Sequence, residues 1–140
     1  MTKVKKWDAW ATFFKTFQKL HQEMEWELKQ KKLPSLEIYD VLWSLEQSPN
    51  HELRFFELSQ QVYLAKFNVS RICQRLIKSG DIEKRGCPSD KRGQYAKITQ
   101  KGLLLRKKIW ETYGKNIRLN FSQKLSPLDH QRLIKLLEKI

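Results

Sequence analysis

The residues best suited to bind a ligand are polar and basic, and they lie between positions 66 and 97. Residues 66–78 have helical periodicity, with an apolar stripe on one side and hydrogen-bonding side chains on the other. Asparagine and arginine can form paired hydrogen bonds with the edges of adenine and guanine. The candidates on this helix for contacts with nucleic acid are Lys66, Asn68, Ser70, Arg71 and Arg75.

A second basic group follows the helix. Alternating residues 82–85 and 94–99 predict two strands of a β-hairpin, and the turn-forming residues 86–93 predict its tip. A guanidinium on a narrow tip can enter the minor groove of DNA, which makes Arg92 the sharpest candidate. The other basic side chains of the hairpin are expected to bind phosphates without reading sequence. They are Lys84, Arg85, Lys91 and Lys97.

Net charge points to the same segment. The 140 residues carry a formal charge of +13, yet residues 1–65 hold 9 basic and 9 acidic side chains. Residues 66–108 hold 13 basic and 3 acidic side chains, and residues 109–140 hold 6 and 3. Charge concentrated in one segment indicates a polyanionic partner, for which nucleic acid and an anionic membrane both stay open at this point.

Other classes of protein are disfavoured. The chain lacks a nucleophile–base pairing, a phosphate-binding glycine loop and metal-ligand spacing among its three histidines, so we expect no enzyme, no cofactor and no metal. It has no apolar run long enough to span a bilayer, so we expect no integral membrane protein. It also has no evident secretion signal, which predicts a cytoplasmic location. Cys73 falls on the apolar stripe and is expected to be buried.

The elements that would position these residues are mainly helical. Periodicity predicts helices over about 6–31, 35–48, 55–63, 66–79, 100–121 and 127 onward, the last burying Leu133, Leu136 and Leu137. Two short helices followed by a hairpin is the order of a winged helix-turn-helix. The long flanking helices have more apolar surface than one small core needs, so we expect them to be shared with a second subunit.

Residues 54–102 resemble the MarR family of bacterial winged-helix transcription regulators. The likeness rests on the first short helix, the recognition helix and the wing signature, which stand here as Glu57–Val62, Asn68–Leu76, Asp90-Lys91-Arg92 and Ile98-Thr99-Gln100-Lys101-Gly102. Leu125-Ser126-Pro127 before the last helix is also similar. The chain departs from the family at the helix–helix turn, with Tyr63 where glycine is usual and Ala65 where a polar cap is usual. A later start of the recognition helix, with or without a cap from Asn68, is therefore the alternative to a start at Lys66.

The resemblance implies one MarR-like domain over residues 1–140, mainly α with a small β-hairpin wing. Residues of about 35–102 would form the DNA-binding lobe, and about 1–33 and 103–140 a helical dimerisation region. The expected partners are double-stranded DNA, bound at a pseudo-palindromic operator, and a second copy of the chain. The resemblance implies that Asp90 orients Arg92 through an ion pair. The alternative is that Asp90 only helps to form the turn. The residues expected to hold the dimer are Trp7, Ile117, Phe121, Leu133, Leu136 and Leu137.

Members of the family also often bind a small aromatic or apolar anionic effector, for which Trp10, Phe14, Tyr39 and Trp43 are the weaker candidates. A non-specific nucleic-acid-binding module and a protein that docks on an acidic partner or membrane are the alternative functions. Thiol-based redox sensing is less favoured: Cys87 lies beside basic residues that favour a thiolate, but redox-sensing relatives rely on a cysteine in the first helix and this chain has none there.

Overall fold

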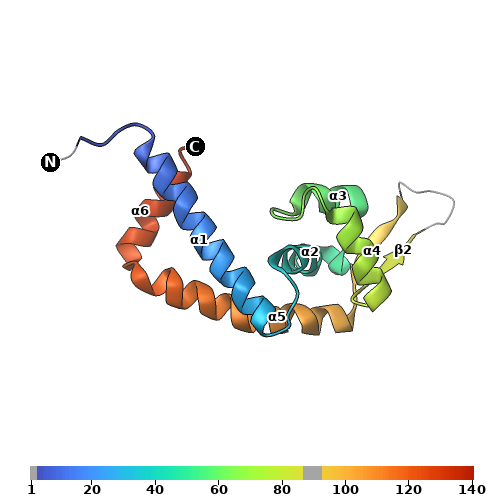
Figure 1. Cartoon of the computed structure of the whole chain (residues 1–140). Coiled ribbons are helices and arrows are strands. Elements are labelled where there is room, and N and C mark those ends of the chain that lie inside the picture. The colour runs from blue at the N-terminus through green and yellow to red at the C-terminus, as the bar shows by residue number, and fades with distance from the viewer. Residues whose placement is uncertain (1–2, 87–92) are drawn as a thin grey trace. The chain divides into compact units, whose positions relative to one another are not determined.

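The computed structural model describes residues 3–86 and 93–140, and Figure 1 shows its helices and small sheet. The helices are α1 (Asp8–Gln30), α2 (Leu36–Glu46), α3 (Phe55–Gln61), α4 (Val69–Ser79), α5 (Gln100–Asn120) and α6 (Pro127–Leu137). The strands are β1 (Glu52–Arg54), β2 (Ile82–Arg85) and β3 (Tyr95–Ile98), and short 3₁₀ turns cover Pro49–His51 (η1) and Ser122–Lys124 (η3). The mainly helical, winged-helix fold class predicted from the sequence is confirmed.

The chain divides into two compact units. We call Lys32–Glu111 the winged-helix lobe, and Met1–Lys31 with Thr112–Ile140 the helical unit. The core of the lobe lies where α2, α3 and α4 meet the sheet, because each of these elements is apolar on the side facing the others. Its side chains with less than a tenth of their surface exposed include Val41, Leu42, Leu45, Leu58, Val62, Leu76, Ile82 and Ile98.

The sheet contains one strand more than the predicted hairpin. Its order is β1-β3-β2 and both pairings are antiparallel, with Leu53 opposite Ala96 and Lys84 opposite Ala96 on the other side. β1 is only three residues long, and only its middle residue, Leu53, is buried. So short a strand has too few residues to show an alternating pattern, which is why the sequence analysis missed it.

The recognition helix α4 begins at Val69, which is the later of the two predicted starts. Asn68 occupies the N-cap position, but its side chain makes no capping hydrogen bond. The helix ends at Ser79, as the predicted range of 66–79 has it, and Gly80 follows with φ of 83°, a left-handed conformation that glycine adopts without strain.

The helical unit pairs α1 with the second half of α5 through buried polar groups. The Asn116 side-chain amide donates to the Glu27 carboxylate at 2.6 Å, and Asn120 donates to Asn116 at 2.9 Å. The Lys31 ammonium donates to the Thr112 hydroxyl at 3.3 Å. Buried polar groups need their partners, so this network favours one alignment of α1 along α5.

α6 begins with a reciprocal cap between Ser126 and Asp129, and Pro127 occupies its first turn. The predicted burial of Leu133, Leu136 and Leu137 is wrong, however, because none of the residues described in α6 is buried. Leu136 and Leu137 are exposed and Leu133 is half-buried. The physical reason is that, in the single chain, no other described element of the helical unit fully covers the apolar side of α6.

Candidate nucleic-acid interface

Helix α4 separates an apolar side from a polar one. Val69, Ile72, Cys73 and Leu76 are buried in the lobe. The residues on the other side are exposed, and they are Ser70, Arg71, Gln74, Arg75 and Lys78. The helix therefore presents three cations and two neutral hydrogen-bonding groups to solvent, within the dimensions that a DNA major groove accepts.

Asp40 of α2 fixes the turn that leads into α4. Its Oδ2 atom accepts hydrogen bonds from the backbone N–H groups of Tyr63 (2.8 Å), Leu64 (2.6 Å) and Ala65 (3.3 Å). The Asp40 side chain is buried, and it supplies an acceptor that Ala65 cannot provide from its own side chain. The departures from the family pattern at positions 63 and 65 are thus compensated from another helix.

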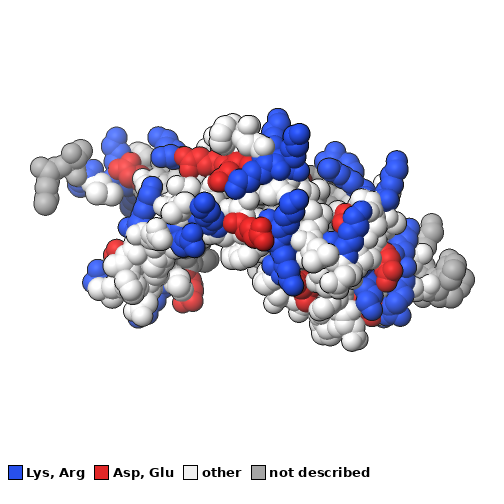
Figure 2. All heavy atoms as spheres, turned by 90° about the horizontal axis from the view of Figure 1, so that it is seen from below, with Lys and Arg blue, Asp and Glu red and all other residues white. Residues whose placement is uncertain are grey.

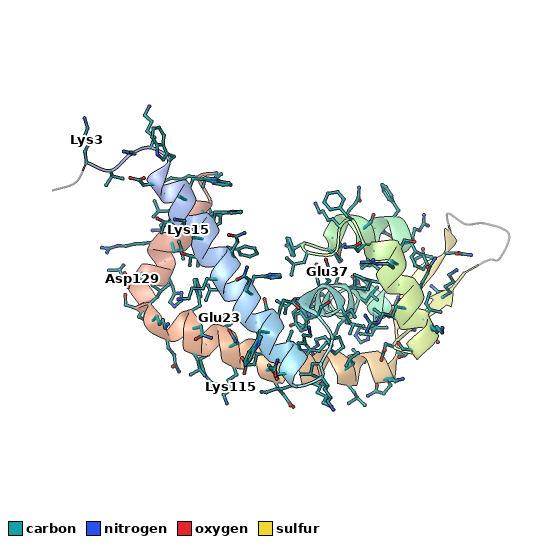
Figure 3. All side chains as sticks on the ribbon, viewed as in Figure 1. Lys3, Lys15, Glu23, Glu37, Lys115 and Asp129 are labelled. Atoms are coloured by element: carbon teal, nitrogen blue, oxygen red, sulfur yellow. The ribbon has the colours of Figure 1, made fainter. Side chains whose placement is uncertain are left out.

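A second carboxylate on α2, that of Glu37, which Figure 3 labels, accepts a hydrogen bond from the residue directly before α4. Its Oε1 atom accepts from the Asn68 side-chain amide at 3.4 Å, and the Asn68 Oδ1 atom accepts from the Arg71 guanidinium at 3.2 Å. Asn68 therefore holds Arg71 in the free chain. Sequence reasoning missed both Glu37 and Asp40; the available signal was an acidic residue, Asp40, directly before the apolar pair Val41-Leu42 in α2.

One hollow of about 590 Å³ lies between α3, α4 and the wing. Lys66, Ser70 and Gln74 line it from the helix side, and Lys84 of β2 lines it from the wing. The structure thus brings together three of the candidates on different elements, with two positive charges at one opening. Figure 2 shows basic side chains projecting from the surface of the molecule with fewer acidic ones between them.

Arg85 and Lys97 lie at a different hollow, of about 560 Å³, lined also by Glu46, His51 and Glu52. The Arg85 guanidinium donates to both carboxylate oxygens of Glu52, at 2.6 and 2.5 Å, and lies over the Tyr95 ring at 5.1 Å from its centroid. The hydrogen bond from Arg85 holds the pKa of Glu52 below its ordinary value. In the free chain, Arg85 is therefore already paired.

Glu52→Gln is expected to release Arg85 for phosphate binding. Neutralising Glu52 removes the anion that competes for the guanidinium, so DNA affinity should rise. The slope of log affinity against log salt concentration should also steepen by about 0.9, the value for one additional phosphate contact. Fluorescence anisotropy titrations across a salt series measure both. An unchanged slope would show that Arg85 makes no phosphate contact.

Cys73 is almost fully buried against the lobe's core, as its place in the sequence predicted. Burial raises the pKa of its thiol to about 11, so the thiol stays protonated at neutral pH. In a Cys87→Ser variant, which leaves one cysteine in the chain, we expect Cys73 to resist a thiol reagent at pH 8 until denaturant is added. Rapid labelling of the native protein would contradict this placement.

Four predicted site residues lie outside the described residues: Cys87, Asp90, Lys91 and Arg92. Their roles stay predictions from the sequence.

The four aromatic residues predicted for an effector pocket fall in different units. Trp10 and Phe14 stack on α1 in the helical unit, at 6.3 Å between ring centroids. In the lobe, the Tyr39 ring stacks with those of Trp43 and Trp110, at 6.3 and 6.1 Å.

The comparisons with known proteins agree with this geometry. Residues 35–93 match the model of the MarR family. That range runs from the start of α2 through α4 and β2. This part of the chain is similar to the MarR family.

The chain is also similar to regulators in sequence and in structure. It is 32% identical over 83 residues to YkoM, a helix-turn-helix-type transcriptional regulator of Bacillus subtilis (strain 168); the match covers 59% of this chain and 53% of YkoM. The fold is that of AbsC, a MarR family regulator from Streptomyces coelicolor, with a TM-score of 0.83, 24% identity, and 99% and 95% of the two chains covered. It is equally that of Sco3205 from the same organism, solved in complex with DNA, with a TM-score of 0.84, 23% identity, and 99% and 90% covered.

The matched region, residues 35–93, contains Glu37, Asp40 and the whole polar side of α4. Asp40 and Glu37 therefore act inside the family's own fold, on the turn where this chain differs from the usual pattern. Among the described residues, the structure contains no helix that is long and apolar enough to cross a membrane.

Proposed function

We propose that this chain is a transcriptional regulator that binds double-stranded DNA in a sequence-specific manner. Helix α4 would enter the major groove with Ser70, Arg71 and Arg75 near base edges or phosphates. The wing would contact the neighbouring minor groove through Arg92, with Lys84 and Lys91 on phosphates. The observation that supports this most is the single hollow shared by Lys66 and Ser70 on one side and Lys84 on the other.

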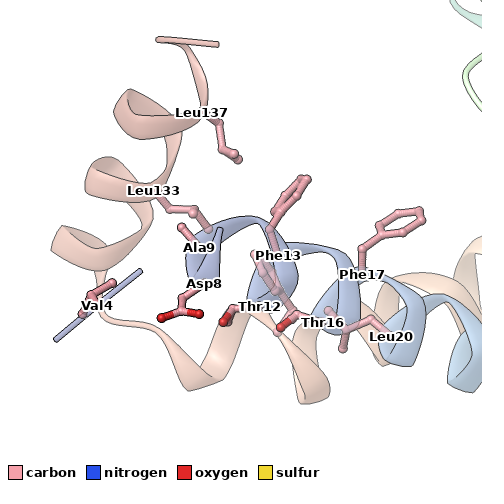
Figure 4. Close-up of a pocket in the computed structure, with 11 residues that line it drawn as sticks. Val4, Asp8, Ala9, Thr12, Phe13, Thr16, Phe17, Leu20, Leu133 and Leu137 are labelled. Carbon is pink, nitrogen blue, oxygen red and sulfur yellow. The ribbon is translucent and has the colours of Figure 1, made fainter. Parts of the chain in front are cut away.

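We propose further that the regulator acts as a homodimer formed through its helical unit. An apolar groove of about 710 Å³ lies between α1 and α6 (Figure 4). Phe13, Phe17, Leu133 and Leu137 line it, and all four are at least partly exposed in the single chain. Exposed apolar patches of this kind mark interaction surfaces in soluble proteins. Phe121 also lines the groove, so three of the six predicted dimer residues lie together.

Two-fold symmetry gives the proposal a geometric consequence for the DNA. A dimer presents its two α4 helices to half-sites on one side of the duplex, so the operator should be a pseudo-palindrome with about 10 bp between half-site centres. Binding at a promoter would then repress or activate transcription. A small aromatic or apolar anionic ligand would relieve binding by shifting the population toward a different spacing of the lobes.

The test is selection of bound duplexes from a random 40-bp pool, followed by competition with bulk DNA at physiological salt. A regulator should prefer its selected duplex by about a thousandfold or more. Arg71→Ala and Arg92→Ala should each reduce that preference. Arg118→Ala removes the same charge from an exposed position of α5 outside the proposed interface and should change it little. Failure to enrich any sequence would favour the non-specific nucleic-acid-binding alternative.

A further inference from the structure

Two aromatic side chains in the turn between α3 and α4 are almost completely exposed. The exposed fraction is 87% for Tyr63 and 98% for Phe67. The backbone that carries them is nonetheless fixed at several points. The N–H groups of residues 63–65 donate to the Asp40 carboxylate, and the Asn68 N–H donates to the Ala65 carbonyl at 2.8 Å. The two exposed side chains are therefore carried by a part of the lobe whose backbone is held by hydrogen bonds.

Phe67 differs from Tyr63 in what it faces. Its side chain lines the hollow between α4 and the wing, together with Lys66, Ser70 and Lys84. It also lies two residues before the start of α4, and the N-terminal part of a recognition helix is the part that faces base edges. Phe67 therefore lies on the surface proposed to contact DNA for two reasons: it comes just before α4, and it lines a hollow that the wing also lines.

The surroundings of Phe67 indicate the chemistry of its partner. Lys66 and Lys84 at the same opening favour a polyanion, while an exposed phenyl ring needs an apolar group to contact. In the major groove of DNA, the apolar group on a base edge is the C5 methyl of thymine, and phenylalanine is among the side chains that contact it. Ser70 and Gln74, which line the same hollow, can donate to the polar edges beside it.

We propose that Phe67 reads the C5 methyl group of a thymine in each half-site. The inference rests on the proposed function and adds a specificity determinant to it, since Phe67 was not among the residues predicted to contact DNA. A cytosine or a uracil at that position lacks the methyl group. Either one would leave the phenyl ring against water or polar atoms.

A double-mutant cycle tests the contact directly. In the duplex selected by the full chain, each thymine is replaced in turn by deoxyuridine, which removes only the methyl group. The wild-type chain should lose about fourfold in affinity at one thymine per half-site. This fold-change corresponds to about 0.8 kcal/mol, the value for burying one methylene group. Phe67→Ala should bind more weakly overall and should bind the thymine and deoxyuridine duplexes equally. Thermal unfolding should be unchanged in this variant, because Phe67 makes little contact with the core.

The matched control is Phe56→Ala, which removes an exposed phenyl ring from α3, 71% exposed and not among those lining the hollow. This variant should keep the fourfold thymine effect. The inference is overturned if the wild-type chain loses no affinity at any thymine, or if Phe67→Ala retains the full loss. If a sequence is nevertheless enriched from the pool, either result would contradict the inference about Phe67 and would still support the proposed function. Failure to enrich any sequence overturns the proposed function itself, and the inference with it.

Discussion

Leu137→Glu is expected to convert the proposed dimer to a monomer and to weaken operator binding by about a hundredfold or more. Leu137 lines the apolar groove between α1 and α6, and 42% of its surface is exposed in the single chain. A carboxylate there would have to be desolvated against a partner's apolar side chains, which costs several kcal/mol when it is unpaired. Losing the dimer also loses the effective concentration that links the two half-sites. Sedimentation velocity and anisotropy titration measure the two effects.

Leu128→Glu provides the matched control on the same helix. Leu128 is 52% exposed and is not among the residues lining the groove, so this variant should stay dimeric and bind the operator normally. Because both leucines are partly or largely exposed in the single chain, neither change should prevent folding. Dimers that persist in Leu137→Glu at micromolar concentration would place the interface elsewhere.

Asp40→Ala is expected to lower the free energy of unfolding by about 2–3 kcal/mol and to weaken operator binding in the molecules that remain folded. The change leaves the N–H groups of residues 63–65 without their acceptor. Hydrogen bonds to a charged group contribute about 2–3 kcal/mol to the free energy of unfolding. With the turn released, the start of α4 loses its fixed position. Urea unfolding measures the first effect, and titration well below the unfolding range measures the second.

Glu37→Ala is the appropriate comparison, because it removes an acidic side chain three residues earlier on the same helix. Glu37 accepts a single long bond from Asn68, so its loss should cost less than 1 kcal/mol. Asp40→Asn should restore much of the stability lost in Asp40→Ala, since the amide oxygen still accepts from the turn. Equal destabilisation by Asp40→Ala and Glu37→Ala would show that the three bonds to the turn are not decisive.

Several features of this protein could be predicted from the sequence because they depend on local pattern. Apolar spacing placed the helices to within a few residues, Gly80 and Ser126 marked helix ends correctly, and Cys73 fell on the buried side of α4. The motifs over residues 54–102 were sufficient to indicate the family. Charge counting found the basic segment, since net charge needs no knowledge of the fold.

Contacts between residues far apart in the chain required the tertiary structure. Asp40 stabilises a turn more than twenty residues away, and Arg85 pairs with Glu52 across the sheet, so neither partner is visible in a local pattern. The burial expected for Leu133, Leu136 and Leu137 failed for the same reason: periodicity shows that a helix has an apolar side, whereas the neighbouring elements decide whether anything covers it. The sequence by itself was enough to predict which residues would bind DNA. The packing of α2 against the α3–α4 turn decided how the recognition helix is held, because backbone N–H groups are satisfied by whichever acceptor the fold brings near.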